Sequence, residues 1–183
     1  ALWFLVLAPY QQYRIFTFLN PYSDPQGSGY HLLQTQIAVG SGQLTGQGIG
    51  YGSQSRLQFL PEHETDFIFA AFAEEWGFIG ASILLCLFGI LLWRLLGPAG
   101  ASPYNFVRLF AIGFSLVIMS HFIIHVGMNI GLLPVTGITI PFMSYGGSHL
   151  LVEFIMLVIL LGMRKYARPA HKQSLSNEML VIN

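Results

Sequence analysis

The chain has 183 residues, of which 54% are hydrophobic and 9% are charged, and its eight basic residues balance its eight acidic ones. Soluble globular proteins carry about 25% charged residues, so this composition excludes an ordinary soluble domain and indicates a membrane protein. The single cysteine, Cys86, excludes a disulfide framework.

The apolar stretches predict an all-α polytopic membrane protein. A helical span needs about 20 mostly apolar residues. Residues 1–9 are apolar but too short, and we expect them to be the end of a truncated membrane helix of a longer chain. Complete membrane helices are predicted over residues 66–96, 106–133 and 149–167.

The long segment 10–65, between the first two apolar regions, is predicted to be a large extracytoplasmic loop. Residues 20–29 are rich in turn-forming types. Residues 30–39 fit a short amphipathic helix at the membrane interface. Residues 40–53 carry six glycines but lack the sequence context of a phosphate-binding loop. Two interpretations remain open there, a tight loop that brings backbone N–H groups to a ligand and a plain linker.

Acidic residues crowd where this loop meets the next span, in the stretch FLPEHETDFIFAAFAEEWG. Thr65 and Asp66 suit the start of a helix, as N-cap and as an acidic residue of the first turn. The small residues that follow Asp66 at spacings of 4, 7 and 11 predict a close helix–helix seam. Glu74 and Glu75 lie deeper, where carboxylates are costly and are functional or paired.

Basic residues gather around the loop 97–105 and after the last span. They are Arg94, Arg108, Arg164, Lys165, Arg168 and Lys172. The positive-inside rule makes the loop 97–105 and the tail 168–183 cytoplasmic, and the segments 10–65 and 134–148 extracytoplasmic. This orientation signal explains the basic tail more simply than nucleic-acid binding, so we predict no nucleic-acid partner.

Polar residues also lie within the later spans. His121, His125 and Asn129 recur every fourth residue, and we expect hydrogen bonds between helices there rather than a zinc site. Ser148, His149 and Glu153 begin the last span, but Ser148 lacks the nucleophile elbow of a serine hydrolase. Pro134 and Pro141 interrupt the helix between two spans, which predicts nonhelical backbone lining a wet, outward-facing cleft.

Ordered motifs along the chain resemble the SEDS proteins (shape, elongation, division and sporulation). They are FLNP at 18–21, DP at 24–25, GYH at 29–31, Gln34, FLPE at 59–62, TDFIF at 65–69, EEWG at 74–77, Pro141 and SYGGS at 144–148. The resemblance covers residues from about Tyr10 to Arg168. It implies the C-terminal part of a ten-span enzyme of the bacterial inner (plasma) membrane that polymerises peptidoglycan from lipid II.

Within that family the chain resembles the RodA-like elongation branch. Residues 53–57, SQSRL, are similar to that branch. The division branch usually carries Lys in its LPTKG turn, whereas residues 133–137 read LPVTG, with Thr136 in that place. One residue departs from the family pattern, because Glu64 stands where the family often has His or Gln.

The resemblance implies inverting transfer to the 4-hydroxyl of N-acetylglucosamine, with undecaprenyl pyrophosphate leaving, during elongation and shape maintenance. A sugar hydroxyl needs a positioned base in the transition state, and the resemblance gives that role to Asp66. Arg56 is a candidate for the pyrophosphate, and Glu62, Gln54 and Ser148 are further substrate-binding candidates. No tightly bound cofactor is expected, although Asp66 and Glu62 could hold a divalent cation such as Mg²⁺.

The resemblance also implies partners, namely a class B penicillin-binding transpeptidase, the elongation machinery and membrane lipids. Two other functions stay open. A lipid II flippase would use Glu74, Glu75 and the wet cleft as a polar track. A structural scaffold of the cell-wall machinery would need neither chemistry nor transport.

Overall fold

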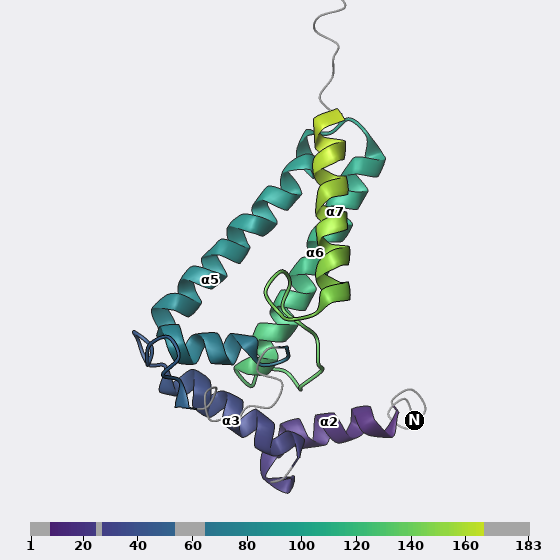
Figure 1. Cartoon of the computed structure of the whole chain (residues 1–183). Coiled ribbons are helices and arrows are strands. Elements are labelled where there is room, and N and C mark those ends of the chain that lie inside the picture. Colours follow the sequence, from purple (N-terminus) through teal and green to yellow (C-terminus); the bar gives the residue numbers. More distant parts are fainter. Residues whose placement is uncertain (1–7, 25–26, 54–64, 167–183) are drawn as a thin grey trace, which may run out of the picture.

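The computed structural model describes residues 8–24, 27–53 and 65–166 (Figure 1). Their helices in chain order are α2 (Pro9–Leu19), the 3₁₀ turn η1 (Pro21–Ser23), α3 (Ser28–Ser41), α5 (Ile68–Ala101), α6 (Asn105–Asn129) and α7 (Gly147–Tyr166). The described residues contain no strand, which confirms the predicted all-α fold.

Three helices are long and apolar enough to cross a membrane, over Ile68–Gly100, Asn105–Asn129 and Gly147–Lys165. The connection between α5 and α6 and the C-terminal end of α7 lie at one end of these helices, and α2 and α3 lie across the other end (Figure 1). At the first end the three helices share a core cluster made of Leu95, Ala111, Phe114, Ile118 and Leu160. The chain therefore forms a multi-pass membrane protein.

The segment predicted as a loop, 10–65, contains more helix than the sequence analysis expected. The interfacial helix predicted over 30–39 corresponds to α3, but α2 was not predicted. Its start has a clear local cause, because Pro9 opens the helix and the Gln11 side chain accepts the Ala8 N–H at 3.0 Å. Residues 54–64 lie outside the described residues.

The predicted span 66–96 differs from α5 in shape. Gly77 has φ 66° and ψ −166° and breaks the helix, so that residues 68–76 run across the end of the bundle and the long segment begins at Phe78 (Figure 1). The seam of small residues is therefore confined to the short segment, where Ala70 packs with Ala38 of α3 and with Phe67.

The segment 42–53 completes the hydrogen bonds that this break interrupts. Phe78 N donates to Gln43 O at 2.9 Å, Ile79 N donates to Leu44 O at 3.1 Å, and Gln47 N donates to Glu74 O at 2.9 Å. A Cβ on either Gly46 or Gly77 would collide with backbone of the other segment. The glycines thus permit a tight loop, as in the first of the two interpretations, and the segment is not a plain linker. The N–H groups of Gln47 and Gly48 bind carbonyl groups of α5.

The predicted span 106–133 ends earlier, at Asn129. Gly131 has φ 77°, and the N–H groups of Leu132 and Leu133 both turn back to Gly127 O. The residues after Gly131 form nonhelical backbone, as predicted, and lead back to α7 at Gly147.

Candidate active site

Asp66 lies where the start of α5, the end of α6 and the connection 130–146 meet. Its backbone oxygen accepts a hydrogen bond from Asn129 Nδ2 at 3.1 Å. The Asp66 carboxylate lies beside Gly137, so that a Cβ atom, if Gly137 had a side chain, would be 3.4 Å from Asp66 Oδ2. Gly137 also adopts φ 74°, a conformation that favours glycine. The carboxylate therefore approaches backbone that carries no side chain, and Asp66 itself is half-buried.

Asn129 is the residue that holds this junction together. It is fully buried, and its Oδ1 accepts the Ala70 N–H at 3.1 Å while its Nδ2 also donates to His125 O at 2.8 Å. Ala70 is the third residue of α5, whose first N–H groups have no partner within the helix. The predicted N-cap at Thr65 is wrong, because α5 begins after Phe67 without a side-chain cap of its own, and Asn129 supplies an acceptor from α6.

Hydrogen bonds from α6 and to Thr65 hold the connection 130–146 in place next to Asp66. His125 Nδ1 lies 2.8 Å from Ile138 O, and since a carbonyl only accepts, Nδ1 carries the proton. Ser144 Oγ donates to Thr65 O at 3.0 Å and accepts the Ile140 N–H at 3.0 Å. His125 therefore bonds the nonhelical connection and not another helix, whereas Asn129 of the predicted stripe makes the expected hydrogen bond between helices, to Ala70 of α5.

Arg14 of α2 brings a positive charge to the same junction. Its Nη1 donates to Val135 O at 3.1 Å, two residues before Gly137. Beside it on α2, a hydrogen bond to Asp24 raises the pKa of Tyr13 and ties α2 to the residues after η1. Sequence reasoning favoured Arg56 because Arg56 is nearer to Asp66 along the chain, and the long-range contact of Arg14 gave no sequence signal.

The other predicted site residues divide into two groups. Arg56, Gln54 and Glu62 lie outside the described residues. Ser148 is exposed on the first turn of α7, whereas Ser144 of the same SYGGS motif makes the contact with the Thr65–Asp66 turn.

Glu74 and Glu75 serve the glycine-rich loop. Glu75 Oε1 accepts the Gly50 N–H at 2.9 Å, and Glu74 Oε1 accepts from Ser53 Oγ at 3.3 Å. Glu74 is fully buried. Both carboxylates are therefore paired, through hydrogen bonds to the loop, but they lie in the segment 68–76 across the end of the bundle and not deeper in a span as predicted.

Comparison with known proteins assigns this arrangement to a family. A family model described as cell cycle protein (FTSW_RODA_SPOVE) matches residues 1–169. The chain belongs to the FtsW/RodA/SpoVE family. This membership confirms the SEDS resemblance.

Curated members of the FtsW/RodA/SpoVE family are similar over most of the chain. The peptidoglycan glycosyltransferase MrdB of Escherichia coli (strain K12) is 47% identical over 151 residues, which cover 82% of this chain and 41% of that protein. Stage V sporulation protein E of Bacillus subtilis (strain 168) is 45% identical over 161 residues, covering 88% and 44%. The peptidoglycan glycosyltransferase RodA of Treponema pallidum (strain Nichols) is 40% identical over 156 residues, covering 85% and 36%. The chain thus spans less than half the length of each of these relatives.

Solved structures share the fold. A chain from a structure described as structural coordination of polymerization and crosslinking by a peptidoglycan synthase complex matches with a TM-score of 0.74 at 34% identity, covering 92% of this chain and 45% of that chain. A mutant of the rod shape determining protein RodA of Thermus thermophilus matches with a TM-score of 0.58 at 27% identity, covering 89% and 60%. A probable peptidoglycan glycosyltransferase FtsW of Thiomicrospira cyclica is also similar, 42% identical over 160 residues. Because relatives named RodA, FtsW and stage V sporulation protein E all match, the elongation branch stays a prediction.

Proposed function

We propose that this chain carries the catalytic base of a peptidoglycan glycosyltransferase that polymerises lipid II into glycan strands. The observation that carries the proposal is the half-buried Asp66, whose backbone oxygen is held by the Asn129 side chain of α6 and whose carboxylate lies beside Gly137 of the connection 130–146. The names of the curated relatives support the same activity.

The chemistry needs a group placed like Asp66. The 4-hydroxyl of an acceptor N-acetylglucosamine attacks the anomeric carbon of a lipid-linked sugar, the bond to the pyrophosphate breaks, and the α linkage becomes β. A base must take the hydroxyl proton as the new bond forms, which contributes about 10²–10⁴-fold to the rate. The junction holds the Asp66 carboxylate beside the Gly137 backbone, where any side chain larger than that of glycine would crowd it.

The leaving pyrophosphate needs positive charge. Arg14 is the described basic residue that contacts the connection beside Asp66, and a guanidinium suits phosphate because it can donate two hydrogen bonds at once. Arg56 remains the second candidate. Gln54, Glu62 and Ser148 remain candidates for substrate contacts, and a Mg²⁺ ion held by Asp66 and Glu62 through water is part of the proposal.

The proposal includes location and partners. The active-site end faces outward from the bacterial inner membrane and the C-terminus is cytoplasmic, which agrees with the basic residues at the opposite end of the helices. One matching structure is described as a synthase complex that coordinates polymerization and crosslinking. By analogy, we expect a class B penicillin-binding transpeptidase as the partner of this chain.

Purified full-length protein in detergent tests the activity directly. With lipid II as the only sugar donor, we expect glycan polymer on a gel that a muramidase digests. The flippase hypothesis predicts no polymer but transfer of lipid II between leaflets of reconstituted vesicles, and the scaffold hypothesis predicts neither. Absence of polymer under conditions where the protein is monodisperse would overturn the proposal.

A further inference from the structure

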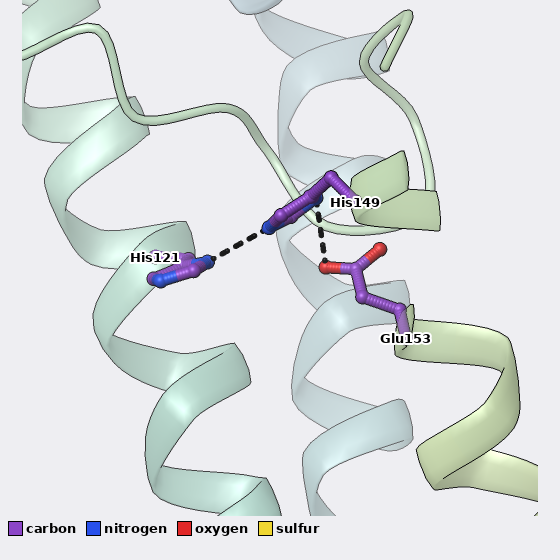
Figure 2. A group of neighbouring side chains, drawn as sticks. All are labelled: His121, His149 and Glu153. Atoms are coloured by element: carbon purple, nitrogen blue, oxygen red, sulfur yellow. Dashed lines mark hydrogen bonds and ion pairs between the residues drawn. The ribbon is translucent and has the colours of Figure 1, made fainter. Parts of the chain in front are cut away.

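A second polar cluster lies between α6 and α7 and takes no part in the chemistry described above. It consists of His121 on α6 with His149 and Glu153 on α7, and His149 lies between the other two side chains (Figure 2). His149 Nε2 is 3.3 Å from His121 Nδ1, and His149 Nδ1 is 3.4 Å from Glu153 Oε1. One ligand atom from each residue lies within 4.8 Å of the others.

The separation of the two imidazole nitrogens, which is that of a hydrogen bond here, is also the separation found in a metal site. Zinc binds histidine nitrogen at about 2.0–2.1 Å, so two nitrogens of a tetrahedral site lie about 3.3 Å apart. His149 presents Nε2 to His121 and Nδ1 to Glu153. Because His149 and Glu153 are four residues apart on one helix face, a change of their side-chain angles would bring both to one ion. Two histidines and a glutamate form a known zinc ligand set, and imidazole nitrogen favours a transition metal over Mg²⁺.

Neighbouring groups orient these side chains. Glu153 Oε2 accepts the Phe142 N–H at 2.9 Å, and Thr139 Oγ1 lies 3.3 Å from His149 Nδ1. Partners of this kind fix the ligands of metal sites and are part of their design. Glu153 is 5% exposed, and its Oε1, at ion-pair distance from His149, makes no hydrogen bond within the described residues. A buried carboxylate oxygen is therefore aimed at the histidines with its hydrogen-bonding capacity unused.

The position of the cluster strengthens the case for a cation. A carboxylate within a membrane span is costly unless it is paired. In the described part of the chain, the partner of Glu153 at ion-pair distance is His149. A divalent ion would compensate the carboxylate and would use both histidines as neutral ligands.

We infer that His121, His149 and Glu153 form a binding site for a divalent transition metal of the zinc class. The bound ion would join α6 to α7. It would also hold the connection 130–146, because Phe142 and Thr139 of that connection contact Glu153 and His149. Since Gly137 and Ser144 of the same connection lie at the Asp66 junction, the metal would brace the active site without touching the substrate.

Metal content of the full-length protein tests this inference independently of glycosyl transfer. The protein is purified through a peptide tag that contains no histidine, without nickel resin, and metals are measured by mass spectrometry after chelation and after reloading with Zn²⁺. We expect one more zinc ion per chain in the parent than in His121→Asn, His149→Ala or Glu153→Gln. Added Zn²⁺ should raise the melting temperature of the parent, since a ligand that binds only the folded state stabilises it.

Two matched variants make the result specific. His31→Ala removes a histidine on α3, away from the cluster, and should keep the zinc ion. His149→Cys replaces one zinc ligand by another and should keep zinc if the variant is monodisperse, which guards against misfolding of His149→Ala. Equal zinc content in the parent and all cluster variants, or no zinc in a reloaded monodisperse parent, would overturn the inference and leave the cluster as hydrogen-bonded imidazoles.

Discussion

At the scale of single residues, Asp66 depends on a neighbour that is distant in sequence. Asn129 joins the backbone of Asp66, the N–H of Ala70 and the carbonyl of His125 with one buried amide. An amide suits this place because it both donates and accepts. The local sequence predicted an N-cap at Thr65. It could not show that Asn129 of α6 would accept the hydrogen bond from the Ala70 N–H.

Asn129→Ala should destabilise the protein strongly. Asn129→Ala removes the hydrogen bonds to the Ala70 N–H and to the Asp66 carbonyl, and a buried group that loses its bond costs about 1–3 kcal/mol. Thermal unfolding in detergent should show a lower melting temperature for Asn129→Ala. The control Ser120→Ala lies on an exposed part of the same helix. It should change the free energy of unfolding by no more than about 0.5 kcal/mol, so its melting temperature should stay close to that of the parent. Equal melting of the two variants would contradict the role given to Asn129.

Arg14 and Arg56 can be separated by their effect on donor use. If either guanidinium holds pyrophosphate, its change to Ala should reduce kcat/KM for lipid II by roughly 10–100-fold, since a hydrogen bond to a charged group contributes about 1.5–3 kcal/mol. The Lys variant should recover part of the loss. Polymerisation kinetics that are the same for parent, Ala and Lys forms would leave that arginine as a lipid-headgroup contact.

At the scale of elements, the break in α5 decides where the active site lies. Hydrophobicity predicted one membrane helix because residues on both sides of Gly77 are apolar. The break depends on backbone pairing with residues 43–48, and no local pattern in the sequence encodes such pairing. The sequence contains Gly46 and Gly77 but does not show why glycine is needed there. The structure shows that the two backbone segments approach too closely for a Cβ at either position.

Gly77→Ala should weaken this element. A residue with a Cβ in that conformation costs about 1–3 kcal/mol, and the new methyl group would also collide with Gly46. Gly89→Ala is the matched control, because a Cβ at Gly89 meets nothing within 4 Å and alanine is the better helix former by about 1 kcal/mol. Melting temperatures in detergent should fall for Gly77→Ala and stay level or rise for Gly89→Ala. The opposite order would show that the break is not required.

At the scale of the whole molecule, composition and hydropathy predicted the class of protein, the three spans and their approximate bounds. These features depend on average solvent preference over many residues, which a sequence reports directly. Many large apolar side chains of the spans are exposed, among them Trp93, Phe106, Leu109 and Val158. They suit contact with lipid or with the part of the relatives that this chain does not cover.

Cysteine labelling in cells tests the orientation. In a Cys86→Ser background, Ser102→Cys lies in the connection between α5 and α6, and Leu44→Cys lies exposed in the glycine-rich loop at the other end. We expect a membrane-impermeant maleimide to label Leu44→Cys in intact spheroplasts and to reach Ser102→Cys only after permeabilisation. Labelling of Ser102→Cys in intact spheroplasts would reverse the topology and place Asp66 on the cytoplasmic side.

The central claim is that Asp66 is the base for glycosyl transfer, and Asp66→Asn is the substitution that isolates it. Asparagine has nearly the same size and keeps the backbone oxygen that Asn129 binds, so the variant should stay folded. The matched Asp66→Glu variant keeps the charge but moves it by roughly an ångström, which can cost about 10²-fold.

The most direct measurement is the initial rate of lipid II polymerisation by purified full-length Asp66→Asn protein beside the parent, at equal monodispersity and melting temperature. We predict a rate lower by about 10²–10⁴-fold, with no polymer visible at times when the parent has consumed its substrate. Polymerisation by Asp66→Asn at the parental rate would contradict the account and move the base to another residue.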